Sequence, residues 1–144
     1  MIEVARHTRV LLDTGPIVAI LSRRDAQHAR CVDALRYIEP PLLTSWPVLT
    51  EAAWLLRSDP IAVSKLLRLG VDGLLQLGEL GIDELPEIDK LYKRYRNLSP
   101  QLADLTLVYI AQRDAIDTIF TLDRRDFSVY RCSGKRGFRV LPDD

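Results

Sequence analysis

Residues 9–22 read RVLLDTGPIVAILS, and in this stretch a strand pattern runs directly into a helix pattern. The apolar run at its start predicts a buried strand over 8–13, and Pro16 suits the opening of a helix over 16–23. Apart from the arginine at its start, Asp13 is the only charged residue in the stretch. Burying a carboxylate without a partner costs several kcal/mol. Asp13 therefore has either a structural role or a positively charged partner that the sequence does not contain.

The composition predicts an ordinary globular protein. The chain has 144 residues, with 47% apolar and 28% charged residues, so a single domain spanning 1–144 can bury a hydrophobic core. Its 20 basic residues balance 20 acidic ones. This balance provides no global basic field, so any contact with nucleic acid must come from a local patch.

Cysteine usage and hydropathy exclude several other classes of protein. Cys31 and Cys132 are far apart and belong to no metal-binding motif, which argues against a zinc site and a disulfide framework. The opening residues lack the apolar core of a signal peptide, and no stretch has the length of about 20 apolar residues that a membrane span needs. We expect a cytoplasmic protein that does not enter a membrane.

The rest of the chain alternates strand and helix patterns. Strands are expected over 8–13, 42–45, 74–77, 118–122 and 138–141, and helices over 16–23, 25–37, 47–57, 60–69, 83–95 and 99–115. This alternation predicts an α/β fold in which a short parallel sheet of about five strands has helices on both faces. Binding sites in such sheets form beyond the carboxyl ends of the strands, and Asp13 and Asp123 lie at two such ends.

Two more isolated acids occur in apolar segments. Glu51 is the only charge in 41–56, and Asp104 is the only charge in 98–112. No lysine or arginine lies within a helical turn of either acid or of Asp13, so local salt bridges cannot compensate them.

Each acid also has a structural interpretation. Asp13 could cap a helix, although a helix that starts at Pro16 would place the cap on Thr14 or Gly15. Glu51 and Asp104 could lie on exposed flanks, and we expect both beyond the first helical turn, where the helix dipole acts weakly. Asp123, followed by Arg-Arg-Asp, could simply form a turn.

Taken together, the four acids favour a metal site. We expect Asp13 and Asp123 to end neighbouring strands, with Glu51 and Asp104 on helices packed beside that edge. Four converging carboxylates repel one another unless a cation is present. Oxygen ligands suit hard divalent ions, so Mg²⁺ or Mn²⁺ is expected.

Four motifs bear a family resemblance: LLDTGPIVAIL (11–21), LTEAAWLL (49–56), LADLTLVYIA (102–111) and FTLDRRDF (120–127). In this order they resemble the PIN-domain nucleases, in particular the VapC-type toxins of bacterial toxin–antitoxin pairs. The resemblance extends over about residues 10–130. An aspartate at a strand end is common, so the ordered set of four carries the resemblance.

The resemblance implies roles for the acids. Asp13, Glu51, Asp104 and Asp123 match the catalytic, metal-binding acids of the family. Asp13 and Asp104 are expected to ligate the metal directly, Glu51 to orient the attacking water, and Asp123 to complete a second metal position. Two further residues are expected in an outer shell: Thr14 and Asp126.

The activity implied by the resemblance is metal-dependent hydrolysis of RNA phosphodiester bonds, leaving a 5′-phosphate and a 3′-hydroxyl. In such chemistry the ion polarises the phosphoryl oxygen and lowers the pKa of a bound water. The resemblance also implies a small antitoxin protein as a partner, and a homodimer.

RNA binding requires cations outside the acid cluster. Candidate phosphate contacts are Arg23, Arg24, Arg124, Arg125, Lys135, Arg136 and Arg139. The pair 124–125 is the strongest candidate because it adjoins Asp123, whereas clustered arginines elsewhere are usually only solvated. For Trp46 and Trp54 we expect a place in the core or in a dimer interface rather than a role in base stacking.

Other classes fit less well. A phosphohydrolase of the haloacid dehalogenase type needs a second acid at Gly15, and a receiver domain needs paired acids after its first strand. No dinucleotide-binding G-x-G-x-x-G motif occurs in the sequence. The remaining alternatives are a different Mg²⁺-dependent phosphohydrolase and a catalytically silent PIN-like binding module.

Overall fold

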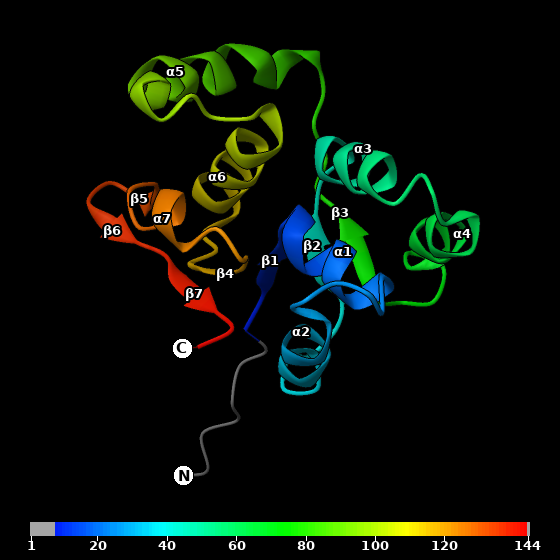
Figure 1. Ribbon diagram of the computed structural model, residues 1–144. Coiled ribbons are helices and arrows are strands. Elements are labelled where there is room, and N and C mark those ends of the chain that lie inside the picture. The colour runs from blue at the N-terminus through cyan, green and yellow to red at the C-terminus, as the bar shows by residue number, and fades with distance from the viewer. Residues whose placement is uncertain (1–7, 144) are drawn as a thin grey trace, which may run out of the picture.

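Five short parallel strands form the sheet in the computed structural model of the chain, which describes residues 8–143. The strand order is β3-β2-β1-β4-β7, as shown in Figure 1. The strands are β1 (Val10–Leu12), β2 (Leu42–Thr44), β3 (Leu75–Leu77), β4 (Thr118–Phe120) and β7 (Arg139–Leu141). All pairs are parallel, which confirms the predicted α/β sheet. The opening segment, where we expect no signal peptide, lies outside the described residues.

The helices follow the predicted order with shifted ends. They are α1 (Thr14–Leu21), α2 (His28–Leu35), α3 (Trp46–Leu55), α4 (Pro60–Arg68), α5 (Leu85–Tyr95), α6 (Leu102–Asp114) and the short α7 (Arg124–Phe127). Two prolines open helices as expected, because Pro47 and Pro60 lie in first turns where no intrahelical donor is lost. Capping side chains precede both: Ser45 accepts a bond from the Val48 amide, and Asp59 from the Ala62 amide.

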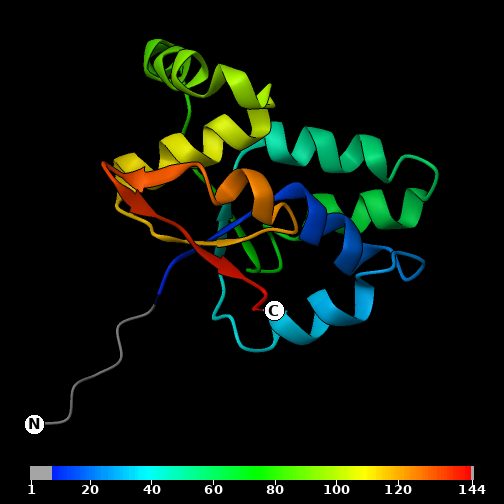
Figure 2. The same ribbon diagram turned by 60° about the vertical axis from the view of Figure 1, so that its left-hand side comes forward.

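Helices cover both faces of the sheet. Both views place α2 on one side and α6 on the other (Figures 1 and 2). Helix α5 packs on α6 at the side away from the sheet, while α1 contacts α2, α3 and α4. Two short 3₁₀ turns, η1 (Ile82–Glu84) and η2 (Arg96–Leu98), flank α5.

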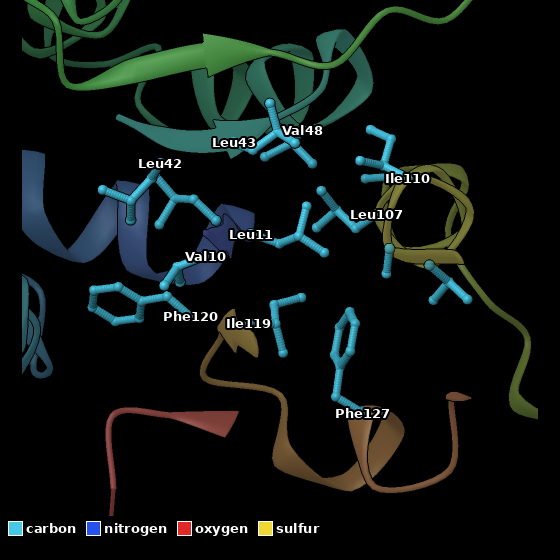
Figure 3. Packing of buried hydrophobic residues seen from close by; sticks show 14 of the residues in the cluster. Val10, Leu11, Leu42, Leu43, Val48, Leu107, Ile110, Ile119, Phe120 and Phe127 are labelled. Atoms are coloured by element: carbon cyan, nitrogen blue, oxygen red, sulfur yellow. The ribbon is translucent and has the colours of Figure 1, made fainter. Parts of the chain in front are cut away.

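The core lies on both faces of the sheet, against α6 on one face and against α1 and α2 on the other. Every residue of β1, β2 and β4 is buried, which explains their continuous apolar pattern. Figure 3 shows Leu11 and Ile119 from the central strands beside Leu107 of α6 and Phe127 of α7. The core thereby fixes α6 and α7 against the ends of β1 and β4.

The register brings the two strand-end aspartates together. Leu11 of β1 pairs with Ile119 of β4, and the Asp13 amide donates to the Phe120 carbonyl at 3.0 Å. Because the strands are parallel neighbours, Asp13 and Asp123 leave the sheet at the same edge, as predicted.

Helix α6 begins later than expected, at Leu102. Ser99 adopts a left-handed conformation with φ 49° at the end of η2, and the chain turns there before the helix starts. Asp104 consequently lies in the first turn of α6, not beyond it. The expectation that Asp104 lies beyond the first turn, where the helix dipole acts weakly, is wrong.

Some elements were not predicted. Helix α7 and the antiparallel hairpin of β5 (Arg131–Ser133) and β6 (Arg136–Gly137) are too short to leave a periodic pattern in the sequence. Trp46 and Trp54 do not belong to the core, because the side of α3 that carries them faces solvent and each is 64% exposed. Among the described residues, no helix is long and apolar enough to cross a membrane.

Candidate functional site

A cleft of about 550 Å³ lies at the carboxyl edge of the central strands. Its acidic lining consists of Asp13, Glu51, Asp104, Asp123 and Asp126. The four predicted acids and the predicted helper therefore lie in one place. No lysine, arginine or histidine is among the described residues that line this cleft.

Asp13 follows β1 and precedes α1, whose first turn includes Pro16. Asp13 occupies the N-cap position, but its side chain makes no capping hydrogen bond to the helix. The position expected for the cap, on Thr14 or Gly15, is wrong because the helix begins at Thr14. The Asp13 carboxylate is buried and accepts a hydrogen bond from the Thr121 hydroxyl at 2.7 Å. Helix capping does not explain this carboxylate.

Asp123 has a structural contact as well as a place at the predicted site. Its carboxylate caps α7 by accepting a hydrogen bond from the Asp126 amide at 3.1 Å, and it also lines the cleft. Its own amide donates to the Thr121 hydroxyl at 3.0 Å. Thr121 thus joins the Asp13 carboxylate to the Asp123 backbone across two neighbouring strand ends.

The tightest group of carboxylates comprises Asp104, Asp123 and Asp126, one oxygen of each lying within 4.8 Å of the others. Opposite ligands of an octahedral Mg²⁺ are about 4.2 Å apart, so small side-chain movements would fit these oxygens to the ion. Asp13 lies outside this group of three, but among the charged groups it has the largest effect on the Asp104 pKa, and Thr121 holds its carboxylate. Asp126 belongs to this close group, where the sequence suggested only an outer position.

A second observation supports a polar ligand in the cleft. Thr14 lines it and is buried, and its hydroxyl has no hydrogen-bond partner within residues 8–143. Buried hydroxyls are normally paired, so this one is available to a bound water or a phosphate oxygen.

The electrostatics of the cleft also indicate that a cation is needed. Burial, followed by repulsion from Asp13, Asp123, Glu51 and Asp126, raises the pKa of Asp104 to about 8. Burial also raises the pKa of Asp13, against the opposing effect of the Thr121 hydrogen bond. For Asp126, burial and then the charge of Asp123 raise the pKa. The apo site thus disfavours full ionisation, which a divalent cation would reverse.

The predicted phosphate-binding residues have different surroundings. Arg125 is exposed, and its charge opposes the rise in the Asp126 pKa, so it lies close to the cluster. Arg124 donates to the Pro142 carbonyl, and Arg136 pairs with Asp117 at 2.5 Å. The others, Arg23, Arg24, Lys135 and Arg139, are exposed and do not line the cleft.

Three polar residues at the site were not identified from the sequence. Thr121 has the clearest signal, a hydroxyl in a buried apolar strand two residues before Asp123. Ser99 and Gln101 line the cleft from the loop before α6, a segment that was expected to be helical.

Comparison with known proteins identifies the family. Residues 10–131 match the PIN domain family model. The chain is 28% identical over 135 residues to ribonuclease VapC26 of Mycobacterium tuberculosis, which covers 92% of this chain and all of that protein. The fold is similar to the crystal structure of VapC20 of M. tuberculosis, described as a sarcin–ricin-loop-cleaving toxin, with a TM-score of 0.74 and 19% identity over 81% of this chain and 91% of that one.

These matches cover the segment that carries the four sequence motifs, and they confirm the resemblance to VapC-type PIN domains. The match to VapC20 supports only the fold. The family model covers every residue of the acidic cleft. The chain belongs to the PIN-domain family and is similar over nearly its whole length to a VapC ribonuclease.

Proposed function

We propose that this protein is a metal-dependent endoribonuclease of the VapC type that hydrolyses RNA phosphodiester bonds. One observation carries the proposal: five carboxylates line a single cleft without a cation among the described residues of its wall. Acids that serve only stability are normally paired, because an uncompensated buried charge is costly. Such an arrangement is expected where a divalent ion binds.

The residues that would hold the ion are Asp104, Asp123 and Asp126, with Asp13 beside them. Mg²⁺ or Mn²⁺ would supply a Lewis acid that polarises the phosphoryl group and lowers the pKa of a bound water. Glu51 faces the same cleft from α3 and forms no part of the tight group, so we assign it the orientation of the attacking water. Thr14 offers its unpaired hydroxyl to a phosphate oxygen.

Three helices are arranged to support this chemistry. Asp13 and Asp123 lie at the N-caps of α1 and α7, and Asp104 lies in the first turn of α6. The positive ends of the helix dipoles therefore face the cleft and offset part of the repulsion between the acids. The Thr121 bridge fixes the separation of two of them.

Purified protein incubated with a panel of structured and unstructured RNAs tests the function. Cleavage in Mg²⁺ or Mn²⁺ that stops in excess chelator is the expected result, with a 5′-phosphate on the downstream product. Unchanged cleavage in chelator would contradict the metal-dependent mechanism. RNA binding without cleavage in either ion would instead favour the catalytically silent binding module.

The partners of the protein are also part of the proposal. The match to a VapC ribonuclease supports a small antitoxin protein that neutralises the activity. Exposed apolar side chains on η1, α5 and α6 support a homodimer, among them Ile82, Leu85, Tyr92 and Leu102. Light scattering of the purified chain tests the dimer, and a monomer at micromolar concentration would contradict it.

A further inference from the structure

Trp54 presents an aromatic ring to solvent near the acidic cleft. The side chain is 64% exposed on the outer side of α3. The Arg57 guanidinium lies over this ring, 4.0 Å from its centroid, and donates to the Trp54 carbonyl at 2.9 Å. A cation is thus held on the ring by two contacts at once.

The position of Trp54 on α3 connects it with the cleft. Trp54 follows Glu51 by three residues, so the two side chains project about 60° apart around the helix, one turn along it. The next residue, Leu55, lines the cleft together with Glu51. Trp54 is not itself a lining residue, but it adjoins Leu55 on the side of the cleft that α3 forms.

Without a divalent ion the cleft itself repels RNA. Its described lining residues include five carboxylates and no basic side chain, and RNA phosphates are repelled by such a wall. Affinity must come from groups outside it. Arg125 is one such group, on α7. Helices α3 and α7 lie on opposite sides of the end of β1, as Figure 1 shows.

We propose that Trp54, with Arg57 on its ring, is a stacking platform for an unpaired base of the RNA substrate. This inference rests on the proposed ribonuclease function. The strand would then pass from Arg125, across the acids, to the aromatic ring on α3. Aromatic rings and arginine planes are the usual means by which proteins hold single-stranded RNA without relying on phosphate contacts alone.

The surroundings of Trp54 favour RNA over a protein helix as the occupant. A docked helix needs a continuous apolar stripe. On the outer side of α3 the two tryptophans are separated by Thr50, and Arg57 follows Trp54. Leu55 beside Trp54 is also exposed, at 53%, but the guanidinium on the Trp54 ring favours a flat base whose phosphate is negatively charged.

Trp46 supplies a matched control. It is equally exposed, at 64%, on the same helix, but it lies at the start of α3, five residues before Glu51, whereas Trp54 adjoins the cleft-lining Leu55. Because these are the only tryptophans in the sequence, Trp46→Phe leaves Trp54 as the sole emitter, and Trp54→Phe leaves Trp46. The two variants allow each ring to be monitored separately in the full-length protein.

The test is titration of both variants with a short unstructured RNA in chelator, where cleavage is not expected. The RNA should quench the emission of Trp54 saturably and leave that of Trp46 nearly unchanged. By fluorescence anisotropy, Trp54→Ala should weaken RNA binding about tenfold, and Trp46→Ala should bind like the wild type. An RNA with one abasic nucleotide at the stacking position should bind wild type and Trp54→Ala equally.

Wild-type affinity in Trp54→Ala, or quenching of neither ring, would overturn the platform. If Trp54→Ala binds and cleaves RNA normally but loses affinity for a protein partner, the surface belongs to that partner and the proposal is wrong. Failure of the wild type to cleave RNA with any divalent ion would instead overturn the proposed function. The two failures are therefore distinguishable.

Discussion

The two ends of helix α6 each carry an aspartate, and the two carboxylates lie in opposite electrostatic surroundings. Asp104, in the first turn, is buried beside four other acids, and its pKa is raised to about 8, first by burial. Asp114, the last residue, contacts Arg113 through both carboxylate oxygens, at 2.9 and 3.1 Å, and that hydrogen bonding lowers its pKa.

The helix dipole makes the contrast sharper. An acid is favoured at the start of a helix and disfavoured at its end. Asp104, at the favourable end, is nevertheless repelled by the neighbouring acids. Asp114, at the unfavourable end, is paired with Arg113. The comparison indicates that Asp114 has a structural role and that Asp104 is placed to bind a cation.

Exchange of each aspartate for asparagine tests this contrast, and the largest expected effect is on the rate of RNA cleavage. Asp104→Asn should reduce the rate of RNA cleavage by at least about a hundredfold, because even residues that only support metal ligands are worth 10- to 100-fold. Asp114→Asn should cleave like the wild type. Cleavage assays in saturating Mg²⁺ compare the two, and near-normal activity of Asp104→Asn would remove it from the site.

Thr121→Val sharpens the comparison. The Thr121 hydroxyl stabilises the Asp13 carboxylate by a hydrogen bond, as the Arg113 guanidinium does for Asp114. The variant keeps the shape and loses the bonds to Asp13 and to the Asp123 amide. Activity should fall about 10- to 100-fold. The Mg²⁺ concentration for half-maximal activity should rise with it, which a purely structural defect would not cause. An unchanged Mg²⁺ requirement would reduce Thr121 to a packing residue.

The pH dependence of stability should differ in sign between the two ends of α6. Asp104 has a pKa of about 8 in the folded state, against an ordinary aspartate pKa of 3.8, so the folded protein binds more protons between these limits. Stability of the metal-free protein should therefore fall as pH rises from about 4 towards 8. For Asp114 the folded pKa is lowered, so its contribution is present above the unfolded value and is lost in acid.

Chemical denaturation in chelator between about pH 5 and pH 8 measures this dependence. Asp104→Asn should flatten the decline, and Asp114→Asn should leave it in place. If the wild type gains stability over this range, Asp104 is not the strained group that the structure implies.

The smallest expected effect concerns Arg125, the exposed cation beside the cluster. Arg125→Ala should weaken RNA binding several-fold and lower the slope of affinity against salt by about one, since one fewer counterion is released. Binding titrations at several salt concentrations provide the slope. Arg24→Ala, exposed and away from the cleft, is the control, and equal slopes for both variants would leave Arg125 as solvated surface.

Much of this arrangement could be predicted from local patterns. Continuous apolar runs identified the buried strands, and the isolation of Asp13, Glu51 and Asp104 in such runs identified the cleft. These signals are strong because an uncompensated acid in an apolar segment has few structural explanations.

Other features depend on contacts that no short window of sequence contains. Because Ser99 adopts a left-handed conformation, α6 starts later than the sequence pattern predicts. Asp104 therefore lies in its first turn, where the helix dipole acts. Thr121 bonds to a residue 108 positions away. Tryptophan is usually highly buried, yet Val48 and Ala52 form the buried side of α3, which leaves both tryptophans in solvent.

The central claim is that the acids lining the cleft, with no basic side chain among the described residues of its wall, form a site where a divalent ion can bind. Thermal melts of the wild type and Asp104→Asn across a Mg²⁺ titration test it most directly. Above about pH 8, where Asp104 is ionised without metal, the metal-free variant should be no less stable than the wild type and can gain up to about 1 kcal/mol, because one repelling charge is removed. Added Mg²⁺ should raise the Tm of the wild type, by an amount equivalent to about 2.7 kcal/mol at a hundredfold excess over Kd, and barely change that of the variant. A variant that loses about 1–3 kcal/mol without metal, as when a buried hydrogen-bonding partner is removed, yet responds to Mg²⁺ like the wild type would contradict the account.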